Sequence, residues 1–326
     1  MKRILFIGPS FIGDTVLALS VMNHITHQWP AAQITVATPP GPIPFYEAIP
    51  QVSRIWIIQK KGRLSHWLTL WKQAIPTPWD LICDLRGSGL SFFLRAQQRL
   101  AWRTPKNSLH RVEQLKGCWQ QHMRPLLSSG HHFEPKIWIR SEDSTAVAHL
   151  PVSPILFAPA ATWPEKQWPP QKFIALYQRL QKQEIKNPLL LIASAAEHEL
   201  CQTVASQIPG ALNVAGQLTL RQIAALLARS ALFVGNDSGL MHMAAAMECP
   251  TVGLFGPSRE ENYAPYGPQV CVVRTPETYE ELWHRIHSPS YQQGTAMDNL
   301  SIDKVLIACE ELLFPKNSQI NKKVSV

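Results

Sequence analysis

Small polar residues lie at the start of an apolar helix predicted in VGNDSGLMHMAAAM, residues 234–247. The pattern predicts a strand, a tight turn and then the helix. The first N–H groups of a helix lack internal partners, and the helix dipole is positive there, so the turn suits an anion. Ser238 adds a hydroxyl, and His242, four residues on, shares its face of the helix. A helix cap beside a core histidine explains the same residues equally well.

A loop in the same half of the chain, APAATWPEKQWPPQKF at residues 158–173, is a second candidate anion site. It follows a predicted strand and holds Thr162 and Lys166, whose charge can neutralise a phosphate. The alternative is a surface lysine before a helix that begins with proline. The sequence contains no D-x-D, so a metal-bridged diphosphate of that type is not predicted. We expect no metal and no cofactor, and lysine, histidine and helix termini would meet the anion.

The third candidate is Asp14 in IGPSFIGDTVL, residues 7–17, where two glycines surround a loop before a helix. The loop has neither the Lys-Ser/Thr of a phosphate-binding P-loop nor the G-x-G-x-x-G of a dinucleotide site. Two interpretations are open. Asp14 is either a general base that faces a cleft or a cap of the helix.

Predicted strands and helices alternate along the chain, which indicates parallel sheets with crossover helices. In the first half, strands are expected at 3–8, 33–38, 53–58 and 80–85, with a helix at 15–26. After a polar stretch at 140–154 the pattern restarts, with strands at 155–160, 188–194, 231–235 and 251–256 and helices at 171–183, 197–208, 219–230 and 239–247. We therefore expect two α/β domains, 1–150 and 151–326, with a mobile tail from about residue 315. Their sites should lie at the carboxyl ends of the strands.

The composition fits this organisation, because 326 residues suit two domains and 45% hydrophobic with 17% charged residues is typical of globular proteins. Six cysteines form no C-x-x-C pair, which favours reduced thiols in a cytosolic protein. The apolar N-terminus is interrupted by Gly8, Pro9, Gly13 and Asp14, unlike a signal peptide. No run reaches 18 apolar residues, so no membrane span is predicted.

The positive charge lies in the first half of the chain. The formal net charge is +8, with 17 Lys and Arg against 8 Asp and Glu in residues 1–150 and 14 against 15 in residues 151–326. A basic domain is typical of proteins that meet phosphates, nucleic acids or anionic membranes. A generally solvated basic surface is an equal alternative.

The order of these motifs resembles glycosyltransferase family 9, the ADP-heptose:lipopolysaccharide heptosyltransferases and their relatives. The matching pieces are the early Gly-Asp, K-x-W-P at 166–169, D-S-G-x-x-H-x-A-A at 237–245, GLFGPS at 253–258 and PYG at 265–267. The segments DLICDLRGSGLS (80–91) and HRVEQL (110–115) are also similar to the family. The resemblance runs from about residue 2 to residue 270, and the D-S-G-x-x-H-x-A-A block is its most specific piece.

The resemblance implies a GT-B fold, in which two Rossmann-like domains face an interdomain cleft. It also implies a metal-independent, inverting transfer from a nucleotide-activated sugar to a lipopolysaccharide core sugar. By position, Asp14 matches the family's proposed base, and Lys166 would stabilise the leaving diphosphate. The donor contacts implied by position are Thr162, Lys166, Glu199 with Glu197 as an alternative, Leu218, Asp237, Ser238, Gly239 and His242. Ala161 stands where the family often has a second hydroxyl, and GPSREENY departs from its commoner Thr-Asp, which leaves the donor open.

The basic segments QKKGR (59–63) and RTPKNSLHR (103–111) suit a phosphorylated or Kdo-bearing acceptor. The expected acceptor contacts are Lys60, Lys61, Arg63, His110 and Arg111, with a solvated charge cluster as the alternative. The expected partners are a nucleotide-sugar donor and a lipopolysaccharide core or lipid A-linked acceptor, and no nucleic acid. The expected location is the cytoplasm, with peripheral association with the inner membrane.

Two other functions fit the same residues. A GT-B enzyme with another nucleotide sugar, or one that isomerises its nucleotide sugar, would need the same anion site. A non-catalytic protein that binds a sugar nucleotide would keep the pocket without transfer. A nicotinamide dehydrogenase is disfavoured, because the glycine fingerprint is missing.

Overall fold

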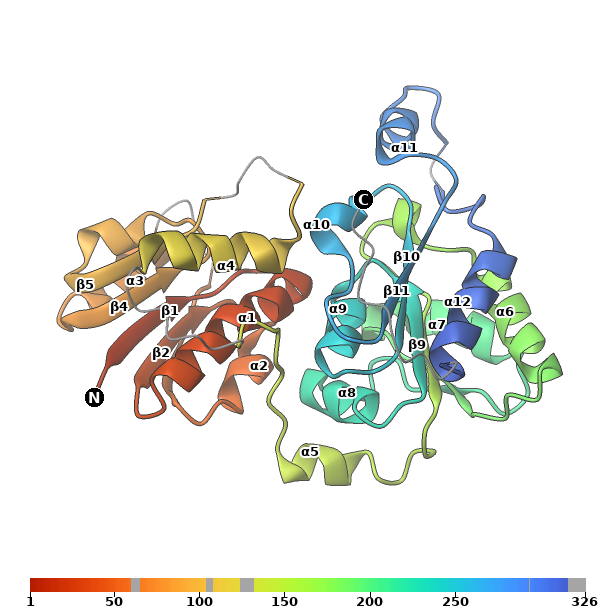
Figure 1. Cartoon of the computed structure of the whole chain (residues 1–326), viewed down its shortest axis with the longest axis horizontal. Coiled ribbons are helices and arrows are strands. Elements are labelled where there is room, and N and C mark those ends of the chain that lie inside the picture. The colour runs from red at the N-terminus through yellow and green to blue at the C-terminus, as the bar shows by residue number, and fades with distance from the viewer. Residues whose placement is uncertain (60–64, 104–107, 124–131, 293, 316–326) are drawn as a thin grey trace. The chain divides into compact units, whose positions relative to one another are not determined.

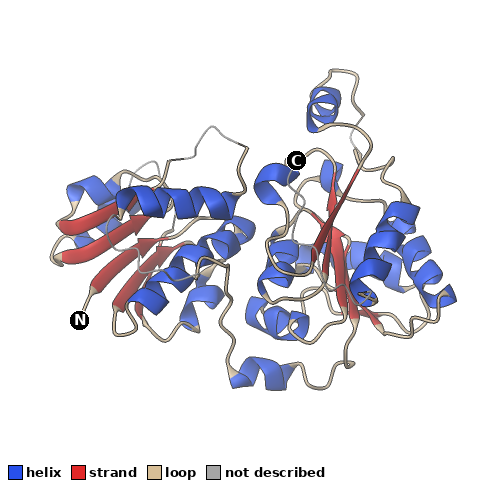
Figure 2. Ribbon diagram, viewed as in Figure 1, coloured by secondary structure: helices blue, strands red, loops and turns tan. Residues whose placement is uncertain are grey.

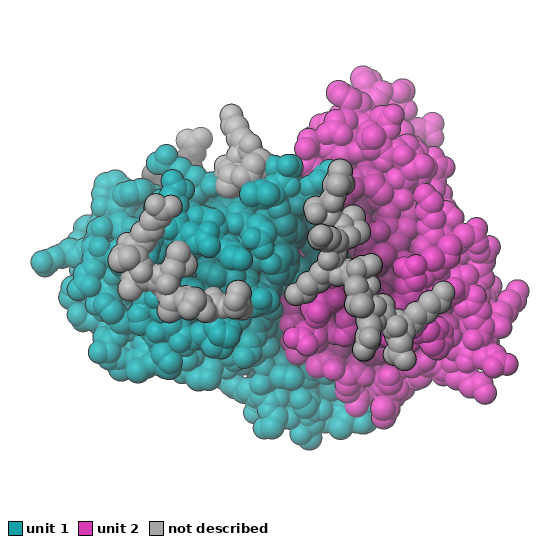
Figure 3. Space-filling model, viewed as in Figure 1, with its two compact units in different colours: residues 1–150, 218–226, 261–267 teal, residues 151–217, 227–260, 268–326 magenta. Residues whose placement is uncertain are grey.

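The computed structural model describes residues 1–59, 65–103, 108–123, 132–292 and 294–315. The chain divides into two compact units, coloured separately in Figure 3. Unit 1 comprises Met1–Leu150, Leu218–Leu226 and Glu261–Gly267, and unit 2 comprises Pro151–Gln217, Leu227–Glu260 and Pro268–Val326. Each unit alternates strands with helices (Figure 2), as the periodicity of the sequence predicts.

Unit 1 is built on a parallel sheet with the order β3-β2-β1-β4-β5 among the described residues. Its strands are β1 (Arg3–Ile7), β2 (Gln33–Thr38), β3 (Val52–Ile57), β4 (Trp79–Asp84) and β5 (Ala96–Ala101). At the carboxyl edge Ile7 pairs with both Ala37 and Asp84. The strand order reverses direction between β1 and β4, and such a switch point is where open α/β sheets bind ligands.

Helices cover both faces of the unit 1 sheet. They are α1 (Ile12–Gln28), α2 (Ile43–Glu47), α3 (Ser65–Ala74), the 3₁₀ turn η1 (Leu90–Phe93) and α4 (Arg111–His122). A further short helix, α5 (Ser141–Ala146), lies away from the sheet (Figure 1). Helices α1 and α4 lie side by side (Figure 1). Successive side chains of a strand point to opposite faces of the sheet. Leu5 and Ile7 join a core with Leu70 of α3, whereas Phe6 points to the other face and contacts Tyr46 of α2.

Unit 2 contains a parallel sheet with the order β11-β10-β9-β6-β7-β8 over the residues that the structure describes. Its strands are β6 (Ile155–Ala158), β7 (Leu189–Leu191), β8 (Leu212–Asn213), β9 (Leu232–Asn236), β10 (Thr251–Phe255) and β11 (Val270–Arg274). From the centre of the sheet, β6, β7 and β8 follow one another toward one edge, and β9, β10 and β11 follow one another toward the other edge. The switch point of this sheet therefore lies between β6 and β9.

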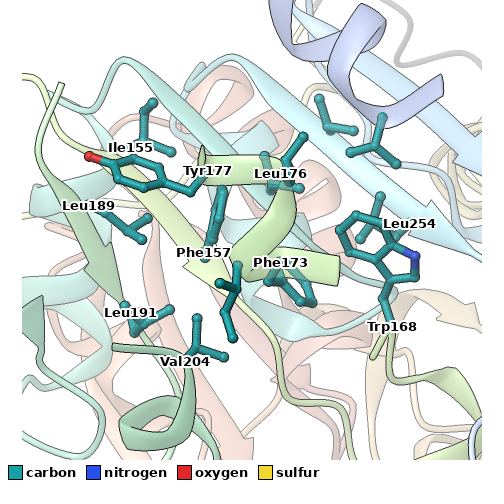
Figure 4. Packing of buried hydrophobic residues seen from close by; sticks show 14 of the residues in the cluster. Ile155, Phe157, Trp168, Phe173, Leu176, Tyr177, Leu189, Leu191, Val204 and Leu254 are labelled. Carbon is teal, nitrogen blue, oxygen red and sulfur yellow. The ribbon is translucent and has the colours of Figure 1, made fainter. Parts of the chain in front are cut away.

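The helical elements of the second half are the 3₁₀ turn η2 (Pro164–Lys166), α6 (Pro170–Lys182), the 3₁₀ turn η3 (Ala195–Glu197), α7 (His198–Ala205), α8 (Leu220–Leu227), α9 (Gly239–Ala246), α10 (Glu260–Tyr263), α11 (Tyr279–Ile286) and α12 (Ile302–Leu313). The close-up in Figure 4 shows the core where α6 meets the sheet, with Phe157 of β6 against Phe173 and Tyr177. Trp168 is fully buried and packs edge-on against Phe173 in the same core.

Two segments of the second half, Leu218–Leu226 and Glu261–Gly267, belong to unit 1. The observed division therefore differs from the single boundary near residue 150 that the sequence predicts. Long-range polar contacts give the reason. Arg221 Nε donates to both carboxylate oxygens of Asp143 at 3.1 and 3.2 Å, and its Nη1 lies 2.9 Å from Glu47 Oε2. In the other segment, the Tyr266 hydroxyl donates to Glu113 Oε1 at 2.7 Å. No sequence period marks such contacts.

The elements that escape sequence prediction are mainly polar or lie near the C-terminus. β5, with the sequence AQQRLA, lacks the apolar run of its neighbours. The predicted mobile tail falls on residues 316–326, outside the described residues apart from residue 315. Across the described part of the chain, no helix is both long and apolar enough to cross a membrane.

Candidate active site

Two loops of unit 2 meet at the switch point of its sheet. One follows β6 and carries Lys166, and the other follows β9 and carries Asp237. Lys166 Nζ lies 2.6 Å from Asp237 Oδ2, and the two side chains are 19% and 9% exposed. The ammonium also lies 4.8 Å from the ring centroid of Trp163, in cation–π geometry. Lys166 is therefore fixed at the carboxyl edge of the sheet and is not a freely solvated lysine.

Asn236, the last residue of β9, anchors the Lys166 loop. Its Oδ1 accepts a hydrogen bond from the Trp168 backbone N–H at 2.9 Å, and its Nδ2 donates to the Pro159 carbonyl at 2.8 Å. Asn236 is fully buried, so both bonds are shielded from water. Asn236 is absent from the residues that the sequence predicts. A sequence signal for its role exists: Asn236 is an amide at the end of an apolar strand, and a buried polar group there needs hydrogen-bond partners.

The segment 295–300 holds the same loop from another side. The Ala296 N–H donates to the Glu165 carbonyl at 2.9 Å, and Trp168 Nε1 donates to the Leu300 carbonyl at 3.1 Å. The Thr295 hydroxyl donates to the Gln167 carbonyl. These contacts position Lys166 through the backbone of its own loop.

The start of α9 completes this site. Ser238 occupies the N-cap position with an extended backbone, φ −152° and ψ 170°, but its side chain makes no capping hydrogen bond. Its Oγ is buried and has no hydrogen-bond partner within the described residues. Gly239 is the first helical residue, and His242 is 4% exposed one turn later. The first N–H groups of α9 and the Ser238 hydroxyl thus offer donors beside Lys166.

The structure also shows the surroundings of the other expected donor residues. Thr162 is exposed on the Lys166 loop, and Glu199 is exposed on α7. Glu197 accepts from the Ser194 N–H at 3.0 Å and from Ser194 Oγ at 2.8 Å, so its carboxylate already caps η3. Leu218 belongs to a segment that groups with unit 1 rather than with the domain assigned to it from the sequence.

Asp14 lines a cavity of about 260 Å³ at the carboxyl edge of the unit 1 sheet. The cap of α1 is Phe11 and Asp14 is the third helical residue, so the N-cap interpretation of Asp14 is wrong. A carboxylate in the first turn still interacts favourably with the helix dipole. The cavity wall comes from the loops after β1, β4 and β5 and from α1 and α4: Pro9, Ser10, Phe11, Asp14, Ala18, Leu85, Arg86, Trp102, Arg111 and Leu115.

Arg111, an expected acceptor contact, lies in this cavity and is held by aromatic neighbours. Its Nη2 donates to the Tyr263 hydroxyl at 2.6 Å, and its Nη1 donates to Gln114 Oε1 at 3.3 Å. The guanidinium carbon lies 5.3 Å from the ring centroids of both Trp102 and Tyr263. The side chain is thereby oriented before any ligand binds.

His110, also expected from the sequence, is a structural residue in this geometry. Its Nδ1 accepts the Val112 N–H at 3.2 Å as the cap of α4, so Nε2 carries the proton and donates to the Ala264 carbonyl at 2.9 Å. Burial lowers the pKa of His110. Neither ring nitrogen is left for an acceptor. Lys60, Lys61 and Arg63 lie outside the described residues.

Two Rossmann-like units, each with polar residues at the switch point of a parallel sheet, define a GT-B glycosyltransferase fold. The family model of glycosyltransferase family 9 (heptosyltransferase) matches residues 136–288 of the chain. Lipopolysaccharide heptosyltransferase 2 of Salmonella typhimurium is 26% identical over 329 aligned positions, which cover 90% of this chain and 92% of that protein.

Solved structures show the same fold. A family 9 glycosyltransferase from Veillonella parvula superposes with a TM-score of 0.79 at 20% identity, covering 97% of this chain and 98% of that one. E. coli ADP-heptose LPS heptosyltransferase II superposes with a TM-score of 0.73 at 22% identity, covering 98% and 100%. The chain is a glycosyltransferase that is similar to the heptosyltransferases of glycosyltransferase family 9.

Proposed function

We propose that this enzyme transfers a heptose, or a closely related sugar, from an ADP-activated donor to a sugar of the lipopolysaccharide core. Its relatives by sequence are heptosyltransferases of lipopolysaccharide and lipooligosaccharide. The observation that carries the proposal is the Lys166–Asp237 pair at the start of α9, because it supplies a fixed cation and helix N–H groups to a diphosphate.

The donor diphosphate would bind to unit 2. Helix N–H groups, the Ser238 hydroxyl, Lys166 and His242 would stabilise the charge that grows on the departing nucleotide, which is usually the largest catalytic contribution. Thr162 and Gly239 would add contacts to the phosphates, Glu199 to the ribose and Leu218 to the adenine. Asp237 would hold Lys166 in place.

The acceptor would bind to unit 1, with Asp14 as the general base. The acceptor's hydroxyl oxygen forms the new bond to the anomeric carbon of the donor sugar, while the bond from that carbon to the diphosphate oxygen breaks. The hydroxyl proton passes to the Asp14 carboxylate, and ADP leaves with the bonding electrons. Attack opposite the leaving group inverts the anomeric configuration. Arg111 would contact the acceptor, and the basic residues Lys60, Lys61 and Arg63 are proposed as further contacts.

We propose that transfer needs no metal ion, because Lys166 and the helix terminus supply positive charge to the leaving group. We also propose that the enzyme works at the cytoplasmic face of the inner membrane, where a lipid A-linked acceptor would lie. Phe92 and Phe93 on η1 are 61% and 74% exposed, which supports contact with a lipid surface.

The test uses purified enzyme, ADP-heptose and lipopolysaccharide isolated from strains whose core lacks successive heptoses. Mass spectrometry should show a gain of one heptose on one of these cores, with the same rate in EDTA. Loss of transfer in EDTA would overturn the metal-free mechanism alone. Donor binding without transfer to any core would favour a non-catalytic sugar-nucleotide-binding protein, and conversion of the donor without acceptor would favour an isomerase.

A further inference from the structure

Arg86 shares the Asp14 cavity with Arg111 and is absent from the site residues that the sequence predicts. Its Nη1 is buried and has no hydrogen-bond partner within the part of the chain that the structure describes. The guanidinium carbon lies 5.3 Å from the ring centroid of Trp67 of α3. Burial lowers the pKa of Arg86, although nearby Asp84 opposes this effect. A partly buried cation therefore keeps an unused donor at the cavity that contains the proposed base.

The turn that carries Arg86 is held by hydrogen bonds to Asp84. Asp84, fully buried at the end of β4, accepts the backbone N–H groups of Arg86 and Ser88 at 3.2 Å each through Oδ1, and the Ser88 hydroxyl at 2.7 Å through Oδ2. Gly87 follows Arg86 with a φ of +65°, a conformation that favours glycine. The backbone of Arg86 is thus fixed by contacts that leave the guanidinium at the cavity.

We infer that Arg86 and Arg111 form an anion subsite beside Asp14, which binds a carboxylate or phosphate group of the acceptor. A guanidinium presents paired N–H donors that match both groups, and such charge-assisted hydrogen bonds are strong. An anion would also satisfy Arg86 Nη1, whose buried donor otherwise carries a desolvation cost. The inference rests on the proposed function for the identity of the acceptor.

The two arginines contribute differently. Arg111 already donates to Tyr263 and Gln114 and stacks on two rings, so its orientation is set by the protein. Arg86 holds the open donor, and its contact is made only when the anion is present. Arg86 is therefore the residue that selects acceptors with an anionic group near the attacked hydroxyl. A site built to bind a polar group discriminates strongly against analogues that lack it.

Steady-state transfer with Arg86→Gln provides the first test. The KM for the acceptor should rise by about 10- to 100-fold, the usual weight of a hydrogen bond to a charged group, while the KM for ADP-heptose stays unchanged. Arg86→Lys should recover part of the loss, because it restores the charge without the paired donors. Arg54→Gln, an exposed arginine of β3 outside the cavity lining, is the matched control and should match wild type.

Chemically altered acceptors identify the anion. One acceptor has its phosphates removed by hydrofluoric acid, and another has its carboxylates reduced to alcohols. If removing one of these groups from the acceptor lowers the transfer rate of the wild-type enzyme to that of Arg86→Gln, that group is the one that Arg86 binds. An unchanged acceptor KM in a folded Arg86→Gln protein would overturn the inference. A penalty for Arg86→Gln that persists after both groups are removed would overturn it too.

A labelling experiment separates the subsite from the proposed function. Phenylglyoxal modifies accessible guanidinium groups, and peptide mass spectrometry reads each arginine separately. Inorganic phosphate or glucuronate should slow modification of Arg86 in the wild-type protein and leave Arg54 unaffected. Protection in an enzyme that transfers no heptose would keep the subsite and remove the proposed function. Equal labelling with and without both anions would remove the subsite even if heptose transfer is found.

Discussion

Lys166 Nζ and Asp237 Oδ2 lie 2.6 Å apart although 71 positions separate the two residues in the chain. The pair joins the loops after β6 and β9 at the switch point of the unit 2 sheet. Because Asp237 already balances Lys166, a diphosphate that binds here must share the lysine with a carboxylate. If the donor diphosphate binds here as proposed, the pair would couple donor affinity to the stability of unit 2, and substitutions should separate the two effects.

Lys166→Met should weaken ADP binding by about 10- to 100-fold, because it removes a charge-assisted contact. It should also lower the free energy of unfolding by about 1–3 kcal/mol, since Asp237 is left with a poorly solvated charge. Calorimetry with ADP and urea unfolding measure the two quantities. An unchanged ADP affinity would make Lys166 a purely structural residue.

Asp237→Asn should have the opposite effect on ADP, which binds more tightly when the competing carboxylate is neutral. The double variant Lys166→Met/Asp237→Asn should regain much of the stability lost in Lys166→Met, because the unpaired charge is gone. It should not regain the affinity for ADP. Recovery of both quantities together would show that Lys166 acts only through the ion pair.

Asp14→Asn should lower the turnover number by about 10²- to 10⁴-fold, the usual contribution of a general base. The side chain keeps its size, and Asp14 is not the cap of α1, so the helix should persist although a charge–dipole interaction is lost. Transfer rates, donor affinity and thermal melts of both proteins form the measurement. Near-normal turnover in the folded variant would remove Asp14 from the chemistry.

Asn236→Ala should loosen the Lys166 loop without touching the donor. The substitution leaves the Trp168 N–H and the Pro159 carbonyl unpaired in a buried place, at a cost of about 1–3 kcal/mol for each group. Both the free energy of unfolding and the ADP affinity should fall. Asn187→Ala, which removes a bond from a partly exposed amide to Ser153, is the control and should leave ADP affinity unchanged. Equal ADP affinity in all three proteins would refute a positioning role.

The stability of the enzyme should fall as the pH drops below about 6.5. Burial lowers the pKa of His24 from its ordinary value of 6.5, and His24 packs between Trp119 and Phe133 with 3% exposure. In that range the unfolded chain binds the proton more readily than the folded one, so acid favours unfolding. Burial lowers the pKa of His110 as well, which adds to the same trend.

Urea unfolding at pH 7.5 and 5.5 measures this effect. His24→Phe keeps an aromatic ring in the pocket and removes the titrating group, so its free energy of unfolding should depend less on pH than that of wild type. Some dependence should persist through His110. An identical pH dependence in both proteins would show that His24 does not contribute.

Much of the fold is predictable from short segments. Apolar runs and helical periodicity locate β1, β2, α6, α9 and β10, because each element buries one face or both within its own length. The parallel connection and the site at the carboxyl edge follow from the alternation of strands and helices. Polar strands such as β5 are not predicted from the sequence, since their pairing depends on neighbouring strands and not on a hydrophobic period of their own.

The sequence by itself determined the two α/β halves, the prediction of an anion site at the turn before α9 and the candidacy of Asp14, Lys166 and Arg111. These rest on local patterns that any fold of the chain must satisfy. The tertiary structure alone decided that Lys166 meets Asp237, that Asn236 holds the loop of Trp168, and that Arg86 joins Asp14 in one cavity. Strand order and side-chain packing bring these residues together across long stretches of chain, and no local period encodes that order.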